Sequence, residues 1–173
     1  MSLNINKLPP VFPIEDVYNM IKNTKKIRDY ALIKTMALSG LRVSEALNLK
    51  YEDINFKDKS LKVVGGKGDK DRFVVIHNEL FHCLVLYTDL YDIEKGQRLF
   101  DLTRARVFQI VKDLDKRFHP HTLRHCYATH LLDKGVPIEI ISQQLGHKDI
   151  DTTMIYAHIS LKKRREGLVG VFE

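Results

Sequence analysis

The chain has 173 residues, of which 44% are hydrophobic and 29% charged, and its formal net charge at pH 7 is +6. This length is enough for one globular domain with a sizeable core, and the sequence holds no internal repeat or low-complexity stretch. No secretory signal is visible and no apolar run is long enough to span a membrane, so we expect no membrane-spanning segment. The basic balance is compatible with a polyanionic partner but does not establish one.

The first third of the chain predicts an extended lead-in followed by three helices. Residues 1–13 carry three prolines and are expected to be extended, and Pro13 suits the first position of a helix. Apolar residues then recur with helical spacing, and Gly40 suits the left-handed position at a helix end. The expected helices span about residues 13–23, 27–38 and 41–49.

Residues 60–76 change from the helical period to the composition of strands. The β-branched runs "SLKVVGG" and "DRFVVI" flank "KGDK", which predicts an antiparallel hairpin with glycine in its turn. Helical spacing then returns, and the expected helices span about residues 79–90, 103–117, 121–134, 137–145 and 150–157. The predicted fold class is mainly α with a small antiparallel β-sheet (α+β).

Two residue types are interpreted as parts of the interior. Cys83 and Cys126, the only cysteines, lie in apolar stretches and read as small buried hydrophobes, not as a disulfide. Tyr51, Tyr87 and Tyr127 are expected in the core with their hydroxyl groups at its rim. Free cysteines are typical of a reducing compartment, so we expect a cytoplasmic protein.

Two arginines follow expected helix starts, where the positive end of the helix dipole disfavours a cation by about 0.3–1 kcal/mol. Arg42 comes two residues after Gly40, and Arg124 comes four residues after Pro120. Each could be a surface arginine whose stem covers apolar surface. Glu45 lies one turn after Arg42 on the same face, either as a surface ion pair or as a support for that arginine.

The stretch "PHTLRHCYATHLL" concentrates positive and titratable groups at a helix start. His121, Arg124 and His125 share one face, which together with the helix N-terminus makes a candidate anion site. The spacing of the two histidines also occurs in zinc sites. The glutamate of the H-E-x-x-H pattern is missing, and a cation lies between the histidines, so we expect no metal.

Two further stretches carry candidate functional residues. Lys67 and Lys70 lie among glycines at the expected hairpin tip, which lacks the G-K-[ST] ending of a nucleotide-binding loop. His147 follows the helix stop at Gly146, and Tyr156 lies nine residues later on a short expected helix. A lone tyrosine of this kind is more often a core residue than a nucleophile.

In combination these motifs resemble one known family. The stretches "ALSGLRVSEALNLKYEDI", "VVGGKGDKDRFVVI" and "HPHTLRHCYATHLLDKGVPIEIISQQLGHKDIDTTMIYAHI" are similar to the catalytic domain of tyrosine recombinases, the Xer and phage-integrase group. The similarity runs in order and nearly without gaps across residues 27–160. It implies the catalytic-domain architecture of that family over residues 14–173, without the N-terminal DNA-clamping domain that usually precedes it.

For the phosphate, the resemblance implies that Arg42 and Arg124 hold the scissile group and that His147 contacts one of its oxygens, with Glu45 in a supporting role. Guanidinium groups suit this task because they bind phosphate oxygens bidentately and stay charged at any working pH. Negative charge that gathers on those oxygens in the transition state is stabilised by such fixed cations.

For bond breaking, the resemblance implies that Tyr156 attacks the phosphorus and leaves a 3′-phosphotyrosyl link. His121 would assist proton transfer at the tyrosine, whose hydroxyl has an ordinary pKa of about 10. Lys67 would protonate the departing 5′-hydroxyl. The covalent link conserves the energy of the phosphodiester, so no ATP, metal or other cofactor is expected.

The resemblance therefore implies a site-specific recombinase or integrase that acts on double-stranded DNA. Lys70 and Lys148 are further candidates for DNA contacts, and the apolar segment 168–172 is expected to join copies of the chain into a multimer. Two alternatives stay open. One is a type IB topoisomerase-like enzyme that nicks and reseals without partner exchange, and the other is a DNA-binding protein of this fold that does not cut.

Overall fold

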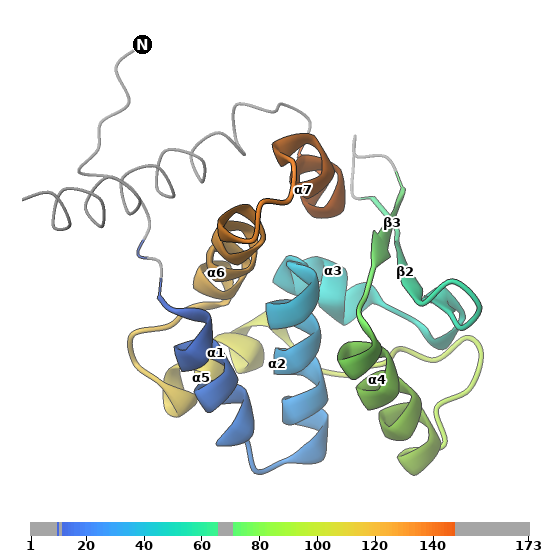
Figure 1. Cartoon of the computed structure of the whole chain (residues 1–173). Coiled ribbons are helices and arrows are strands. Elements are labelled where there is room, and N and C mark those ends of the chain that lie inside the picture. The colour runs from blue at the N-terminus through green and yellow to red at the C-terminus, as the bar shows by residue number, and fades with distance from the viewer. Residues whose placement is uncertain (1–9, 11, 66–70, 148–173) are drawn as a thin grey trace, which may run out of the picture.

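The computed structural model in Figure 1 describes residue 10, residues 12–65 and residues 71–147. It is mainly helical with one small antiparallel sheet, which confirms the predicted fold class. The elements are α1 (Ile14–Lys22), α2 (Ile27–Ser39), α3 (Val43–Asn48), a 3-10 turn (Tyr51–Asp53), β1 (Ile54–Asn55), β2 (Ser60–Val63), β3 (Arg72–Val75), α4 (Asn78–Leu90), α5 (Arg104–Leu114), α6 (Pro120–Asp133) and α7 (Ile138–Leu145).

Several predictions fall on residues that the structure does not describe. These are most of the lead-in, the helix expected at 150–157, the segment 168–172, and the candidate residues Lys67, Lys70, Lys148 and Tyr156. Among the residues it does describe, no helix has both the length and the apolar character needed to cross a bilayer.

Helix α2 is the centre of the fold because it is covered on several sides. It packs against α1 and α6 on one side and α4 on the other (Figure 1). Every residue from Ala31 to Ser39 is buried, as expected for a helix that is surrounded. Its polar members remain satisfied, because the Thr35 and Ser39 hydroxyls donate to carbonyl oxygens one turn earlier at 2.7 and 2.6 Å.

The sheet contains the predicted hairpin and one strand that the sequence pattern did not reveal. Strands β2 and β3 pair antiparallel with Leu61 opposite Val74, and the sheet order is β1-β2-β3. Strand β1 is only two residues long and pairs Ile54 with Leu61. A two-residue strand has no alternation to detect, so tertiary pairing alone defines it.

Helix α5 ends earlier than its apolar spacing predicted, at Leu114 instead of residue 117. Asp115 takes an extended conformation, with φ −158° and ψ 117°. Its carboxylate accepts hydrogen bonds from the backbone amide of Arg117 at 2.9 Å and from the side chain of that residue. This local side-chain-to-backbone turn competes with continued helix.

Gly40 closes α2 in the left-handed conformation, with φ 68°, as the sequence predicts. A Cβ atom placed there would lie 2.5 Å from Tyr127 Cδ1 and 2.7 Å from Leu145 Cδ2, in α6 and α7. The absence of a side chain therefore lets the end of α2 lie close to the middle of α6 and the end of α7. This junction is where Arg42 and Arg124 approach each other.

Gly40→Ala is expected to lower the free energy of unfolding by about 2–4 kcal/mol, from left-handed strain together with overpacking. The measurement is chemical denaturation at fixed pH. Gly135→Ala is the matched control, because Gly135 also has a positive φ, 82°, but has no heavy atom within 4 Å of an added Cβ. Equal losses in the two variants would contradict the close-packing explanation.

Candidate active site

Arg42 is placed by the extended link between α2 and α3. It occupies the N-cap position of α3, where its backbone amide donates to Glu45 Oε2 at 2.8 Å. Its guanidinium Nη1 donates to Glu45 Oε1 at 2.9 Å. The pair that the spacing of the two residues predicts is therefore formed, and it leaves the Arg42 side chain 36% exposed.

Arg124 lies in the interior, so its interpretation as a surface arginine is wrong. The residue is 5% exposed, and its Nη1 and Nη2 donate to the carbonyl oxygens of Gly40 and Leu145, each at 2.7 Å. These carbonyls stand at the C-terminal ends of α2 and α7, which carry negative partial charge. The cation that looked misplaced near the start of α6 is therefore stabilised by the ends of two other helices.

The two arginines that the sequence singled out meet around one carboxylate. Arg42 Nη1 lies 2.9 Å from Glu45 Oε1, and Arg124 Nη1 lies 3.8 Å from Glu45 Oε2. Residues from α3 and α6, far apart in the chain, thus share one basin. Such convergence is what binding of a single tetrahedral anion requires.

A third arginine completes the cluster, and sequence reasoning missed it. Arg72 at the start of β3 donates through Nη1 and Nη2 to the two oxygens of Glu45, at 2.9 and 3.1 Å. A signal was present in the pattern of the strand, because Arg72 shares a face with Val74 and Ile76, which are buried. A cation on the inward face of a strand needs a partner.

Glu45 stays ionised among these cations. Burial by itself raises the pKa of the Glu45 carboxyl, but hydrogen bonds from Arg72 and from the Arg42 amide, with the charges of Arg72 and Arg124, outweigh it. Its pKa therefore lies below the ordinary 4.5. Three guanidinium groups around one carboxylate leave a net charge of two positive units at neutral pH.

His147 lies beside this cluster and is neutral at pH 7. Burial, and then the charges of Arg124, Arg42 and Arg72, lower its pKa to about 4. It follows Gly146, whose left-handed conformation ends α7. A neutral imidazole at this position can donate a hydrogen bond to an anion without adding charge.

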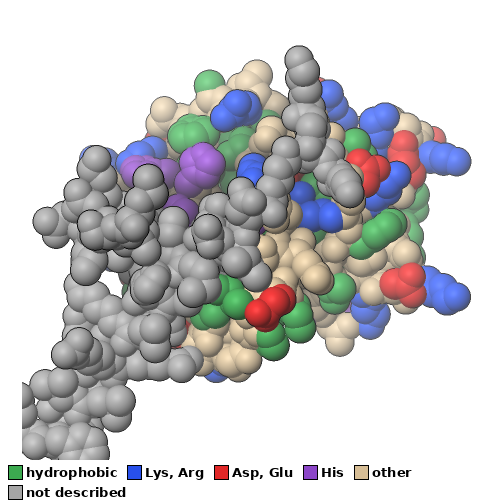
Figure 2. All heavy atoms as spheres, turned by 90° about the horizontal axis from the view of Figure 1, so that it is seen from above, with side chains coloured by type: hydrophobic (Ala, Val, Ile, Leu, Met, Phe, Trp, Pro, Cys, Tyr) green, Lys and Arg blue, Asp and Glu red, His purple; other side chains and the backbone are tan. Residues whose placement is uncertain are grey.

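His121 and His125, which the sequence places on one face of α6 with Arg124, lie near that arginine. His121 is exposed at the start of α6, and His125 is half-buried. Burial, followed by the charges of His121 and Arg124, lowers the pKa of His125 to about 4. Figure 2, seen from above, shows histidine side chains gathered close to Lys and Arg side chains on one face of the molecule. Among the described residues, no three His, Cys, Asp or Glu side chains are placed to hold a metal ion.

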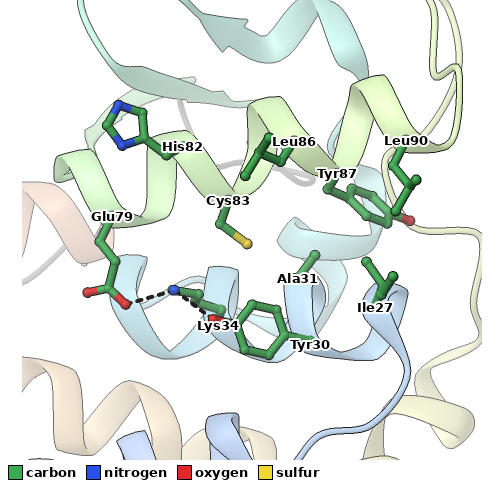
Figure 3. Close-up of a pocket in the computed structure, with 10 residues that line it drawn as sticks. All are labelled: Ile27, Tyr30, Ala31, Lys34, Glu79, His82, Cys83, Leu86, Tyr87 and Leu90. Atoms are coloured by element: carbon green, nitrogen blue, oxygen red, sulfur yellow. Dashed lines mark hydrogen bonds and ion pairs between the residues drawn. The ribbon is translucent and has the colours of Figure 1, made fainter.

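A groove of about 440 Å³ lies between α2 and α4, and its lining does not suit phosphate binding (Figure 3). Its buried cation, Lys34, is already bonded to Glu79 at 2.7 Å and to the Tyr30 hydroxyl at 2.9 Å. Burial raises the pKa of the Cys83 thiol, which keeps it protonated and unreactive. None of the predicted site residues that the structure describes lines this groove, so the arginine cluster is the better candidate.

Comparison with known proteins gives a consistent assignment of family. Residues 12–163 match the sequence model of the Phage integrase family. The chain is 35% identical over 173 residues to the tyrosine recombinase XerA of Pyrococcus horikoshii, covering 93% of this chain and 61% of the relative. The chain thus spans less than two thirds of the length of that curated relative.

Solved structures show the same fold. One is the XerH site-specific recombinase bound to a palindromic difH substrate in a post-cleavage complex, with a TM-score of 0.79, 25% identity, and coverage of 97% of this chain and 55% of that chain. Another is the catalytic domain of bacteriophage HP1 integrase, with a TM-score of 0.69, 26% identity and 86% of each chain covered.

Proposed function

The chain belongs to the phage integrase family, and we propose that it is the catalytic domain of a site-specific recombinase that cleaves and rejoins DNA strands. The observation that carries this proposal is the meeting of Arg42 and Arg124 around Glu45, which makes a fixed cationic basin. The XerH relative, solved with its DNA substrate after cleavage, supports a DNA substrate for this chain too.

In the proposed reaction, the Tyr156 oxygen bonds to the scissile phosphorus while the bond from phosphorus to the 5′-oxygen breaks. The phenolic proton passes towards His121, and the departing 5′-oxygen takes a proton from Lys67. The phosphodiester is exchanged for a phosphotyrosyl ester, so no bond energy is lost to water. Attack by another strand's 5′-hydroxyl reverses the step and rejoins DNA.

The described residues would stabilise the charge of this transition state. Arg42 presents an exposed guanidinium, and Arg124 is fixed by two helix ends, so little reorganisation is needed when charge develops. His147 is neutral at pH 7 and adds a hydrogen-bond donor. Removing one such donor from a preorganised oxyanion site slows catalysis by roughly 10²–10³-fold in other enzymes.

We also propose a cytoplasmic location. The proposed substrate is DNA, and both cysteines are free, which is compatible with a reducing compartment.

The experiment is covalent capture on a suicide substrate. A pool of duplexes with randomised arms carries a nick beside a fixed central position, so that cleavage releases a short strand that cannot religate. An SDS-resistant adduct between protein and DNA is the expected result. Binding to the duplex without any adduct would favour the non-cutting alternative. Relaxation of supercoiled DNA without recombinant products, using duplexes selected in the capture, would favour the topoisomerase-like one.

A further inference from the structure

Arg72 differs from the other two arginines in how it uses its hydrogen-bond donors. Two of its N–H groups bind both oxygens of Glu45, and Nε donates to the Gln144 carbonyl at 3.0 Å. Three of its five N–H donors are therefore committed to the protein. Its side chain is 13% exposed, against 36% for the side chain of Arg42, whose guanidinium bonds to Glu45 through Nη1.

The contacts of Arg72 connect three separate elements. It starts in β3, reaches Glu45 in α3, and touches the last turn of α7 at Gln144. A Cβ on Gly146 would lie 2.7 Å from Arg72 Nη1 and 2.8 Å from its Cδ and Cζ, so the side chain lies against the backbone that immediately precedes His147.

Gln144 strengthens the same junction from the other side. Its Oε1 accepts from the Val75 amide at 3.0 Å, and its Nε2 donates to the Val75 carbonyl at 2.9 Å. The side-chain amide thus pairs with the open edge of β3 as a neighbouring strand would. Helix α7 is consequently tied to β3 by Arg72 and Gln144 together.

We propose that Arg72 is a positioning residue for the reaction. It holds Glu45 and the end of α7 before His147 in place, so that Arg42 and Arg124 present a fixed geometry to the phosphate. This inference rests on the proposed function. Burial raises the pKa of Glu45, and the hydrogen bonds from Arg72 are the largest of the influences that lower it below its ordinary value. This lowered pKa agrees with a tightly held carboxylate. Arg72 itself makes no contact with DNA.

Two readouts separate positioning from phosphate contact. The first is the slope of log K for DNA binding against log salt, which a lost phosphate contact reduces by about one unit. The second is the single-turnover rate of adduct formation at saturating protein. Arg72→Gln is expected to slow adduct formation by about 10–100-fold and leave the salt slope unchanged, whereas Arg42→Gln reduces both.

Arg72→Lys is a second variant that is expected to stay folded, because it keeps the positive charge and one hydrogen bond to Glu45. Adduct formation is still expected to fall about tenfold, since an ammonium group cannot bind both carboxylate oxygens and the Gln144 carbonyl at once. Arg28→Gln is the matched control. Among the described residues, Arg28 forms an ion pair with its neighbour Asp29 alone, about 18 Å from Gly40 along α2, and full activity is expected.

Wild-type adduct rates in both Arg72 variants would overturn the inference. A fall in salt slope equal to that of Arg42→Gln would also overturn it, because Arg72 would then contact a phosphate directly. Failure of the wild-type chain itself to form any adduct would instead refute the proposed function, and the inference with it.

Discussion

Tyr156→Phe is expected to abolish the covalent protein–DNA adduct completely while DNA affinity stays within a few-fold of wild type. The change removes one oxygen, which in the proposed reaction is the atom that bonds to phosphorus. Water that attacked the phosphodiester in its place would give no covalent link to the protein. The measurement is adduct yield on the nicked duplexes, with binding measured in parallel.

A second tyrosine provides the control for this change. Tyr87 in α4 is buried and donates its hydroxyl to the Leu99 carbonyl at 2.9 Å. Burial, with a smaller effect of Tyr91, raises the pKa of Tyr87 to about 12, which makes it a poor nucleophile. Tyr87→Phe should lower stability by about 1–3 kcal/mol and leave adduct yield intact. An adduct formed by Tyr156→Phe would contradict the assignment of the nucleophile.

Arg124→Ala is expected to lose at least about 100-fold in adduct formation and also about 3–5 kcal/mol of stability. Catalysis falls because a phosphate ligand is removed. Stability falls because the buried guanidinium bridges the Gly40 and Leu145 carbonyls, and its loss leaves both without that donor. Because Arg124 is only 5% exposed, its replacement carries a structural cost in addition to the loss of cleavage.

Arg42→Ala separates the two effects. Cleavage should fall because a proposed phosphate ligand is lost. The Arg42 side chain is 36% exposed and bonds only to Glu45 among the described residues, so the free energy of unfolding should change by less than about 1 kcal/mol. The measurements are thermal unfolding and adduct rate at a temperature where all variants are folded. Normal cleavage by the Arg124 variant, or equal destabilisation of both, would contradict the roles assigned here.

The sequence predicted most of the fold because its local signals agree with its tertiary structure. The helical spacing of apolar residues, the glycine at position 40 and the two β-branched runs are signals that act within a few residues. The structure confirms the helices and strands that they predict among the residues it describes. The end of α5 was missed because the turn at Asp115 depends on one side chain. Strand β1 was missed because its pairing partner alone defines it.

The sequence indicated which residues form the cationic cluster better than it indicated how they are held. Arg42 and Glu45 lie three residues apart, so their pairing could be inferred from helical spacing. The burial of Arg124 depends on the ends of α2 and α7, which no local pattern brings together. Arg72 lies in β3 and its ion-pair partner Glu45 lies in α3, so no local sequence pattern connects the two residues. The catalytic roles of all these residues stay predictions, and Lys67 and Tyr156 lie outside the residues that the structure describes.

The most direct measurement is a crystal structure of Tyr156→Phe bound to a duplex selected by covalent capture with the wild-type chain. We expect guanidinium nitrogens of Arg42 and Arg124 about 2.7–2.9 Å from oxygens of one phosphate, with Glu45 still bonded to Arg72 behind them. Arginines that contact two different phosphates, or a cluster that faces away from the DNA, would contradict a shared phosphate site.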